Sequence, residues 1–329
     1  MTPDVGHLEG RTIFITGGTG SLGHTLAAAI LDHTREARVT VYSRGESRQA
    51  EMAEEFSRHR DRLRMRLGDV RDRDRLELAL WRVDIVVHAA ALKRVDDTAR
   101  HPEELIKTNV LGTQNVLRAA LTTGVRRILL VSSDKGVEAA NPYGGTKFLA
   151  EQLVTAWNAV GYARGQLSSC VRYGNVLSST GSVAHAFRHA AQDGEVASVT
   201  EGGMTRFWMT RDEAAALVCR CLRLMRGGEV FVPKLPSAPV EALARAMGAP
   251  GVRLVPKRPG GEKAHETLLS EHESHRAVDV GDLFVVEPDW ELPVDREPWK
   301  GEALPAGFSY RSDTAPRLSL DALAEMGRV

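Results

Sequence analysis

Residues 11–23 read RTIFITGGTGSLG, a run of β-branched and aromatic residues followed directly by a glycine-rich turn. The run predicts a strand, and the apolar spacing of residues 22–31 predicts a helix after the turn. Glycine allows a tight turn and lets backbone N–H groups approach a pyrophosphate at the positive end of a helix. An ordinary glycine-rich turn is the alternative, but the position between strand and helix favours a dinucleotide site. The residues expected to form it are Gly17, Thr19, Gly20, Ser21, Leu22 and Gly23.

The alternation of strand and helix continues through the first half of the chain. Strands separated by helices need crossover connections, which place parallel strands side by side with helices on both faces. The sequence therefore predicts an α/β fold with a Rossmann-type doubly wound parallel sheet. Further strands are expected at 37–42, 63–67, 83–89, 126–132 and 167–173, and helices at 46–58, 71–81, 103–123 and 143–160.

Beyond residue 174 the pattern loosens, because glycine and proline become frequent and the apolar runs shorten. We predict a dinucleotide-binding domain over residues 1–174 and a smaller C-terminal substrate-binding domain over 175–329. The strand-like segment 228–233 and a helix near 239–247 are assigned to the second domain. The two domains are expected to be interleaved, since residues 207–227 include a helical apolar pattern that suits packing back on the sheet.

Composition limits the class of protein. The chain has 329 residues, of which 43% are apolar, and equal numbers of acidic and basic residues, so no net charge attracts nucleic acid. No run of about 18 apolar residues occurs, and none precedes the first strand, which favours a cytoplasmic protein with no membrane partner. The three cysteines are interpreted as reduced and structural, and nothing resembles a metal site.

The end of the second predicted strand indicates which nicotinamide cofactor fits. An acidic residue that binds the ribose 2′-hydroxyl is usual there in NAD sites, but this strand ends Ser43-Arg44, with Arg48 one helical turn later. Arginine offers the planar cation that a 2′-phosphate needs, so we predict NADP; the alternative is that both arginines are solvated. Asp69 is expected to accept a hydrogen bond from the adenine amino group. Further cofactor contacts are expected at Val70, Ala89, Ala90, Ala91 and Lys93.

A group of polar residues follows the fifth predicted strand, at the sheet edge where ligands bind. Tyr143 and Lys147 are four apart at the start of a predicted helix and so share one face. The lysine is expected to lower the pKa of the phenol and to hold the nicotinamide ribose, so that Tyr143 can take a proton from a sugar hydroxyl. Ser133 ends the strand, and Asp134 and Lys135 follow it. This pair could be a surface ion pair or the general acid and general base of an elimination.

A series of motifs runs through the chain in the order TGGTGSLG, VYSRGESRQAEM, GDVRD, HAAALKRV, KTNVLGTQNV, SSDK, YGGTK, VRYGNV, MTRFWMT, GGEVFVPK and RPGGEKAHE. Together they resemble the UDP-N-acetylglucosamine 4,6-dehydratase (5-inverting) family of pseudaminic acid biosynthesis, within the extended short-chain dehydrogenase/reductase superfamily. The resemblance spans about residues 10–290. It implies an enzyme that makes UDP-2-acetamido-2,6-dideoxy-β-L-arabino-hex-4-ulose from UDP-N-acetylglucosamine.

The resemblance also implies roles for the catalytic residues. Tyr143, aided by Lys147 and Ser133, would deprotonate the C4 hydroxyl while C4 is oxidised with NADP⁺ as hydride acceptor. Lys135 would then remove the acidified C5 proton, and Asp134 would protonate the departing C6 hydroxyl. Hydride return to C6 and protonation of C5 from the opposite face would give the inverted 4-keto-6-deoxy sugar with no net redox change.

By the same resemblance, several residues are expected to contact the substrate. Each of the arginines among them could instead pair with a nearby carboxylate. The sequence departs from the family in the loop 136–142 and in an extra glycine within 258–262, near the expected phosphate clamp. The expected substrate contacts are Lys93, Arg172 and Asn175 near the sugar or diphosphate, and Arg206 and Arg258 at the UDP phosphates.

Three other functions remain possible. A nucleotide-sugar 4-epimerase would use Tyr143 and Lys147 but would need no Asp134–Lys135 pair. A retaining 4,6-dehydratase would share the chemistry and return the C5 proton to its original face. A cofactor-binding scaffold without activity would be expected to lack at least one of these four residues, and all are present. The helices expected at 103–123 and 143–160 could also pair between subunits, so we predict a homo-oligomer.

Overall fold

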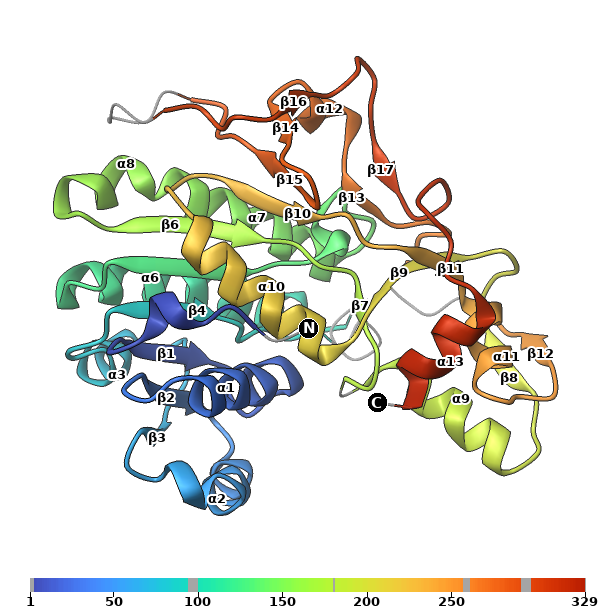
Figure 1. Ribbon diagram of the computed structural model, residues 1–329, viewed down its shortest axis with the longest axis horizontal. Coiled ribbons are helices and arrows are strands. Elements are labelled where there is room, and N and C mark those ends of the chain that lie inside the picture. The colour runs from blue at the N-terminus through green and yellow to red at the C-terminus, as the bar shows by residue number, and fades with distance from the viewer. Residues whose placement is uncertain (1–2, 94–99, 180, 257–260, 291–296, 329) are drawn as a thin grey trace.

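A computed structural model describes residues 3–93, 100–179, 181–256, 261–290 and 297–328. Its main feature is a twisted central sheet, which in the described part of the chain has ten strands in the order β16-β14-β15-β10-β6-β5-β4-β1-β2-β3 (Figure 1). The predicted α/β fold with a doubly wound parallel sheet is confirmed. The parallel strands are β1 (Thr12–Thr16), β2 (Arg38–Ser43), β3 (Leu63–Leu67), β4 (Ile85–His88), β5 (Arg127–Val131), β6 (Leu167–Val171) and β10 (Val230–Pro233).

Helices cover both faces of this sheet because its strands are apolar on both sides. In β1, Ile13 and Ile15 face the core formed with α1 and α10, whereas Phe14 faces the core formed with α3, α6 and α7. This alternation follows from the two-residue period of a strand. The helices are α1 (Ser21–His33), α2 (Glu46–Glu55), α3 (Arg73–Ala79), α5 (Pro102–Leu105), a π-helix (Ile106–Leu111), α6 (Gly112–Thr123), α7 (Pro142–Ala156), α8 (Asn158–Gly161) and α10 (Arg211–Leu224), with short 3₁₀ turns at Gly6–Leu8, Ser57–His59, Asp134–Gly136 and Tyr162–Arg164.

The second half of the chain builds a smaller lobe beside the carboxyl ends of the parallel strands (Figure 1). Its own core is formed around Phe187, Trp208 and Leu243. It contains β7 (Asn175–Val176), α9 (Val183–Gln192), β8 (Ala197–Val199), β9 (Thr205–Met209), β11 (Ser237–Pro239), α11 (Val240–Ala246), β12 (Val252–Leu254) and α13 (Leu320–Arg328). The segments β13 (Thr267–Leu269), α12 (Glu271–Ser274) and β17 (Tyr310–Arg311) lie near the other end of the sheet, where β13 pairs with β17 and α12 lies beside β14 (Figure 1).

The boundary between the two parts differs from the domain limits expected from the sequence. Residues 230–233 were assigned to the second domain, but β10 pairs with β6 in parallel and extends the main sheet. Helix α10 precedes it and lies beside α1. The four residues of β10 are all buried, which is typical of a strand covered on both faces. Beyond β10 the sheet continues with the antiparallel strands β15 (Leu283–Val286), β14 (Ala277–Asp279) and β16 (Glu302–Ala303).

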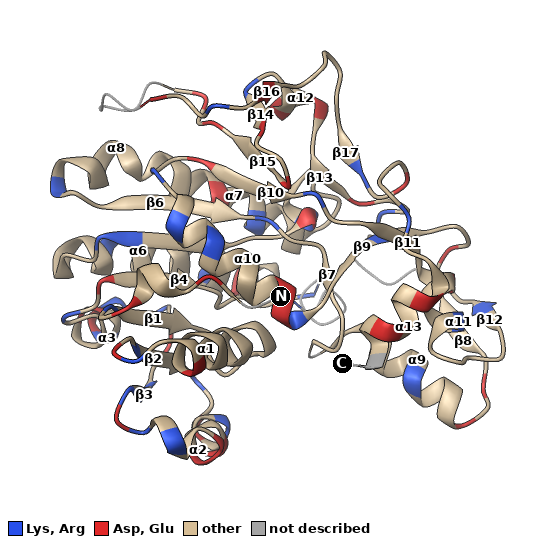
Figure 2. Cartoon of the chain, in the orientation of Figure 1, with Lys and Arg blue, Asp and Glu red and all other residues tan. Residues whose placement is uncertain are grey.

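None of the helices that the structure describes combines the length and the apolar composition needed to cross a membrane. Charged residues of both signs are spread over the whole described fold (Figure 2). The stretch expected as one helix at 103–123 contains a π-helical turn at Ile106–Leu111. Such turns frequently accompany functional sites. This one lies against α7, which carries the predicted catalytic tyrosine and lysine.

Candidate active site

A cavity of about 1220 Å³ runs from the glycine-rich loop, along the carboxyl ends of the parallel strands, to the smaller lobe. Most of the predicted site residues line it, although they are scattered over the first 206 residues. Asp134 and Arg172 do not line it, and Arg258 lies outside the described residues. The predicted residues on its wall are Gly17, Thr19, Gly20, Ser21, Leu22, Gly23, Ser43, Arg44, Arg48, Asp69, Val70, Ala89, Ala90, Ala91, Lys93, Ser133, Lys135, Tyr143, Lys147, Asn175 and Arg206.

The glycine-rich loop leaves room for a pyrophosphate. Gly17 has a φ of +66° and donates its N–H to Tyr42 O at 2.8 Å, and a Cβ there would lie 2.9 Å from the backbone of Ala90. Gly20 is the N-cap of α1 and offers no side chain to the first helical N–H groups. Backbone donors at an uncapped helix start are an anion site. The loop therefore fits the diphosphate of a dinucleotide.

Arg44 and Arg48 line the cavity just beyond the end of β2. The Arg44 side chain is 53% exposed, and its Nη1 lies 3.6 Å from Asp69 Oδ2. Asp69 also accepts hydrogen bonds from Arg71, including one of 2.7 Å from Nη2. Although burial opposes the effect, Arg71 and Arg44 lower the pKa of Asp69. Asp69 is thus an ionised acceptor within reach of any group bound beside Arg44.

The start of α7 positions Tyr143 and Lys147. Asn141 caps this helix by accepting a 2.9 Å hydrogen bond from Gly144 N, and Pro142 occupies the first turn, where its missing N–H costs nothing. One turn later, Lys147 Nζ donates a 2.7 Å hydrogen bond to Val131 O at the end of β5. Burial lowers the pKa of Lys147 to about 8.

The electrostatic environment of Tyr143 differs from the one expected. Burial raises the pKa of Tyr143, whereas the charge of Lys135 and a hydrogen bond with Ser133 act to lower it. The sequence assigned the lowering charge to Lys147, which is instead bound to a backbone carbonyl. Lys135 acts on the phenol because the Asp134–Gly136 turn places it near Tyr143.

Asp134 and Lys135 form a partly buried ion pair at the end of β5. Lys135 Nζ lies 3.0 Å from Asp134 Oδ1 and donates a 3.2 Å hydrogen bond to Asn175 Oδ1. Ser133 Oγ donates to the same Asp134 oxygen at 2.8 Å. Asp134 is fully buried, its Oδ2 has no hydrogen-bond partner among the described residues, and burial raises its pKa. Only Ser133 and Lys135 of this trio reach the cavity.

Comparison with known proteins identifies the family to which the chain belongs. The model of the polysaccharide biosynthesis protein family matches residues 13–288. The chain belongs to this family. An inverting UDP-N-acetylglucosamine 4,6-dehydratase of Campylobacter jejuni (strain 81-176) is 37% identical to it over 94% of both chains. The resemblance expected from the motifs is thereby confirmed.

Two other family relatives are similar over nearly the whole chain. A UDP-glucose 4-epimerase of Rickettsia typhi is 35% identical over 96% of this chain and 95% of its own. The crystal structure of Pen from Bacillus thuringiensis has a TM-score of 0.88 and 31% identity, with 97% of each chain covered. Both dehydratase and epimerase names therefore occur among relatives of comparable identity.

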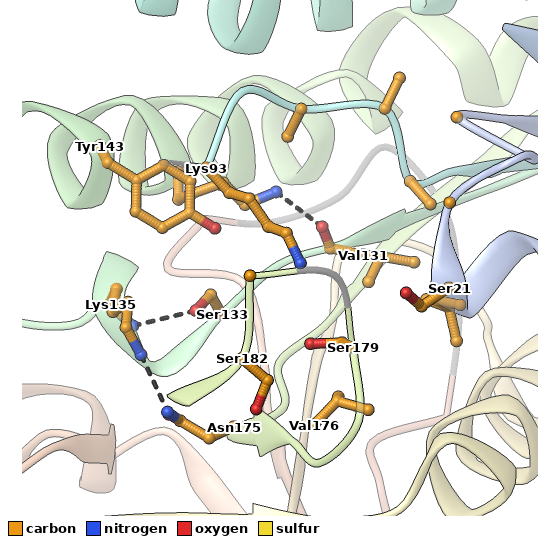
Figure 3. A pocket seen from close by; sticks show the side chains of 18 of the residues that line it. Ser21, Lys93, Val131, Ser133, Lys135, Tyr143, Asn175, Val176, Ser179 and Ser182 are labelled. Atoms are coloured by element: carbon orange, nitrogen blue, oxygen red, sulfur yellow. Dashed lines mark hydrogen bonds between the residues drawn. The ribbon is translucent and has the colours of Figure 1, made fainter. Parts of the chain in front are cut away.

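In the part of the cavity that lies against the smaller lobe, Arg206 of β9 lines the wall. Its guanidinium is nearly buried and donates to Thr205 O at 2.7 Å, Ala264 O at 3.1 Å and Glu262 Oε1 at 3.1 Å. These contacts hold the arginine in a fixed orientation at the cavity wall. Asn175, in β7, reaches the same region through its contact with Lys135 (Figure 3).

The expectation that Arg172 faces the sugar is wrong for this structure. Its side chain is 2% exposed and lies between Glu151, at 2.7 Å, and Glu273, at 2.6 Å. Arg172 Nη1 also donates to Leu268 O at 3.0 Å. Arg172 therefore pairs with carboxylates, which was the alternative that the sequence left open. Arg172 links α7 to the segment around α12, behind the cavity.

Two buried residues, one beside the cavity and one lining it, were not found from the sequence. Asn109, in the π-helix, bonds both backbone groups of Leu92 at 2.8 and 3.0 Å and also donates to Thr146 Oγ1 at 3.0 Å. It thereby connects the strand end before Lys93 with α7. An amide in an apolar helical pattern was the signal available for it. The second, Glu266, lies 3.5 Å from Lys135 Nζ. It is the last residue of the RPGGEKAHE motif, which was its only signal in the sequence.

Proposed function

We propose that this protein is an NADP-dependent, inverting UDP-N-acetylglucosamine 4,6-dehydratase. The observation that carries the proposal is the 3.0 Å Asp134–Lys135 pair, whose lysine lines the same cavity as Tyr143 and Lys147. Tyrosine and lysine suffice for oxidation of a sugar hydroxyl, whereas a second acid–base pair is needed only where water is also eliminated. The curated relative with 37% identity carries the same name.

The chain's own residues supply the proton transfers. A bound dinucleotide would provide the hydride acceptor and donor for the sugar. Tyr143 takes the C4 hydroxyl proton. Ser133 can stabilise the ionised phenol when its hydroxyl donates to Tyr143 instead of Asp134. Lys147 lies one turn along α7 and would hold the nicotinamide ribose. The resulting C4 ketone makes the C5 proton acidic, which prepares the elimination.

Lys135 and Asp134 then exchange protons with C5 and the C6 hydroxyl. Lys135 must first give up a proton to act as a base, and Asp134 Oδ1 lies 3.0 Å away to receive it. This transfer produces a neutral amine facing the cavity and a neutral carboxyl behind it. Because Asp134 does not line the cavity, its proton reaches the departing hydroxyl through Lys135 or Ser133.

NADP is supported by the cation environment at the adenosine end of the cavity. Arg44 and Arg48 both line it, beside Ser43 and Gly45. A 2′-phosphate there would meet two guanidinium groups, which suit its geometry. The loop around Gly17, where a Cβ would lie 2.9 Å from the Ala90 backbone, supports a site for the diphosphate of this dinucleotide.

A homo-oligomer forms part of the proposal. Ile106 and Leu111 of the π-helix and Phe148 and Leu149 of α7 are apolar and between 46% and 48% exposed. The two helices lie against each other, so these side chains can be covered by a second copy. Light scattering after size-exclusion chromatography measures the assembly, and a monomer at micromolar concentration would contradict this part.

The test of function is a proton NMR time course with UDP-N-acetylglucosamine and catalytic NADP⁺ in deuterated water. Inverting dehydration gives a new C6 methyl group, deuterium at C5 and the L-arabino configuration. The same methyl group with the original C5 configuration would indicate a retaining dehydratase. A C4 epimer without a methyl signal would favour the epimerase named among the relatives. Tyr143→Phe is the matched inactive control, since it removes one oxygen.

A further inference from the structure

Glu266 is the one carboxylate, among the described residues, that lies within 4 Å of three separate side-chain cations. It lies immediately before β13, is 2% exposed and lines the cavity. Its Oε1 is 3.5 Å from Lys135 Nζ and 3.8 Å from Arg206 Nε, and its Oε2 is 3.0 Å from Lys263 Nζ. A buried carboxylate so placed is ionised, and it balances charges that burial would otherwise disfavour.

The segment around Glu266 is tied to the loop that follows Lys135. Lys263 Nζ donates to Val137 O at 2.8 Å, and Asn141 Nδ2 donates to Gly261 O at 3.1 Å. Farther along, Thr267 Oγ1 donates to Glu138 Oε2 at 2.8 Å. These contacts connect residues more than 100 positions apart in the sequence. They hold Glu266 at a set distance from Lys135.

Lys135 therefore lies between two carboxylates, one on its own turn and one from the C-terminal part of the chain. Asp134 approaches to 3.0 Å and Glu266 to 3.5 Å. Although burial opposes it, these two charges raise the pKa of Lys135. The cations Lys135, Lys263 and Arg206 in turn outweigh burial and lower the pKa of Glu266 to about 2. The positive charge of Arg206 works in the opposite direction and disfavours the protonated form of Lys135.

We propose that Glu266 is a positioning residue for dehydration, which holds the Lys135 ammonium between itself and Asp134 and sets when Lys135 can act as a base. The expected effect of Glu266 on the rate of dehydration rests on the proposed function. Glu266 is not a catalytic residue in this account, since it acts through Lys135. Its negative charge keeps the proton on Lys135, and transfer of that proton to Asp134 must work against this charge.

The experiment measures the protonation of Lys135 without turnover. The NADP-loaded protein is acetylated with trace acetic anhydride between pH 7 and pH 11, and the labelling of Lys135 is compared with that of Lys300. The side chain of Lys300 is 90% exposed and serves as an internal reference. Only the neutral amine reacts, so each unit by which the pKa falls raises the labelling ratio about tenfold.

In Glu266→Gln, the ratio at a fixed pH should rise about tenfold or more, because an opposite charge within about 4–6 Å shifts a pKa by about one unit or more. Glu262→Gln is the matched control. Glu262 lies in the same segment and also contacts Arg206, but among the described residues the ion pairs of Lys135 are with Asp134 and Glu266 and not with Glu262. An unchanged ratio in Glu266→Gln, or an equal rise in both variants, overturns the proposal.

A second variant covers the case in which Glu266→Gln does not fold. Lys263→Met removes a cation that shares the Glu266 carboxylate, so Glu266 acts more strongly on Lys135. The labelling ratio should then fall, in the opposite direction, and a rise or no change overturns the proposal.

In active enzyme, the acid limb of the kcat–pH profile of Glu266→Gln should move to lower pH, whereas a purely structural role would lower kcat at all pH values equally. Loss of the proposed function would appear as no conversion of sugar, while the labelling result stands on its own.

Discussion

Gly144 packs so closely against Lys135 that a Cβ at position 144 would overlap the Lys135 carbonyl oxygen. The contact brings the first turn of α7, which carries Tyr143, onto the turn that carries Lys135. Gly144→Ala should therefore push apart the two segments that are proposed to carry the catalytic residues. Since displacement by about 1 Å can cost 10²-fold in rate, we expect kcat to fall by about that factor.

Gly145→Ala is the matched control for this change. Gly145 is the next residue of α7, and a Cβ there would meet no heavy atom within 4 Å. Alanine favours a helix over glycine by about 1 kcal/mol, so this variant should be active and slightly more stable. Steady-state kinetics and thermal unfolding of both variants check the prediction. Equal activities would show that the close contact does not position the catalytic residues.

Lys135→Ala should abolish dehydration and leave cofactor binding largely intact. The side chain contacts Asp134 and Asn175 on the substrate side of the cavity. The glycine-rich loop proposed to bind the dinucleotide begins at Gly17, directly after β1, whereas Lys135 follows β5. The measurement pairs methyl-group formation by NMR with titration of NADP⁺ by calorimetry. Turnover equal to that of the unsubstituted protein would exclude the proposed role of Lys135.

Arg44→Ala should weaken NADP⁺ binding about 10- to 100-fold, because a hydrogen bond to a charged group contributes about 1.5–3 kcal/mol. NAD⁺ binding should change little, since it has no 2′-phosphate. Calorimetry on cofactor-free protein measures both constants. Arg38→Ala is the control, as Arg38 is an exposed residue of β2 that does not line the cavity. Equal losses for both dinucleotides would contradict the assignment of NADP.

The buried His88 should make the fold sensitive to mild acid. It lies between the hydroxyls of Thr16 and Thr113, at 2.7 and 2.9 Å, and burial lowers its pKa to about 3. In the unfolded chain the pKa is about 6.5, so the unfolded state binds the proton first as the pH falls. Stability present above about pH 6.5 is therefore lost progressively down to about pH 3.

Between pH 6.5 and pH 5, this linkage amounts to about 1.5 kcal/mol in the free energy of unfolding. Urea unfolding at both pH values measures it. His88→Asn should be less stable at either pH, but its loss between the two should be smaller by about this amount. An identical loss in the variant would mean that His88 is not the group responsible.

Arg172→Met should destabilise the fold by about 3–5 kcal/mol, because it leaves Glu151 and Glu273 without their buried cation. Arg311→Met is the control, since Arg311 is 42% exposed and its pair with Asp313 lies at the surface. That change should cost less than about 1 kcal/mol. Urea unfolding followed by circular dichroism measures both. If Arg172→Met were stable and bound substrate more weakly, that result would favour the direct sugar contact that the sequence predicted for Arg172.

Local patterns determined much of this protein. The alternation of β-branched strands with helices predicted the order of elements, and the expected strand at 63–67 agrees with β3 at both ends. The spacing of four between Tyr143 and Lys147 placed both on one face of α7. These inferences succeed because strand and helix periods are properties of neighbouring residues. The family motifs added a reaction class for the same reason, since each motif is a short continuous stretch.

Only the tertiary structure decided which partners the charged side chains take. Arg172 was expected in the cavity and lies behind it, Asp134 is buried behind Lys135, and Glu266 enters the site from beyond residue 260. The position of β10 in the main sheet also depends on its pairing with β6. A charge is stabilised by whatever lies within a few ångströms of it in space. Those neighbours come from distant parts of the chain, and sequence spacing carries no direct information about them.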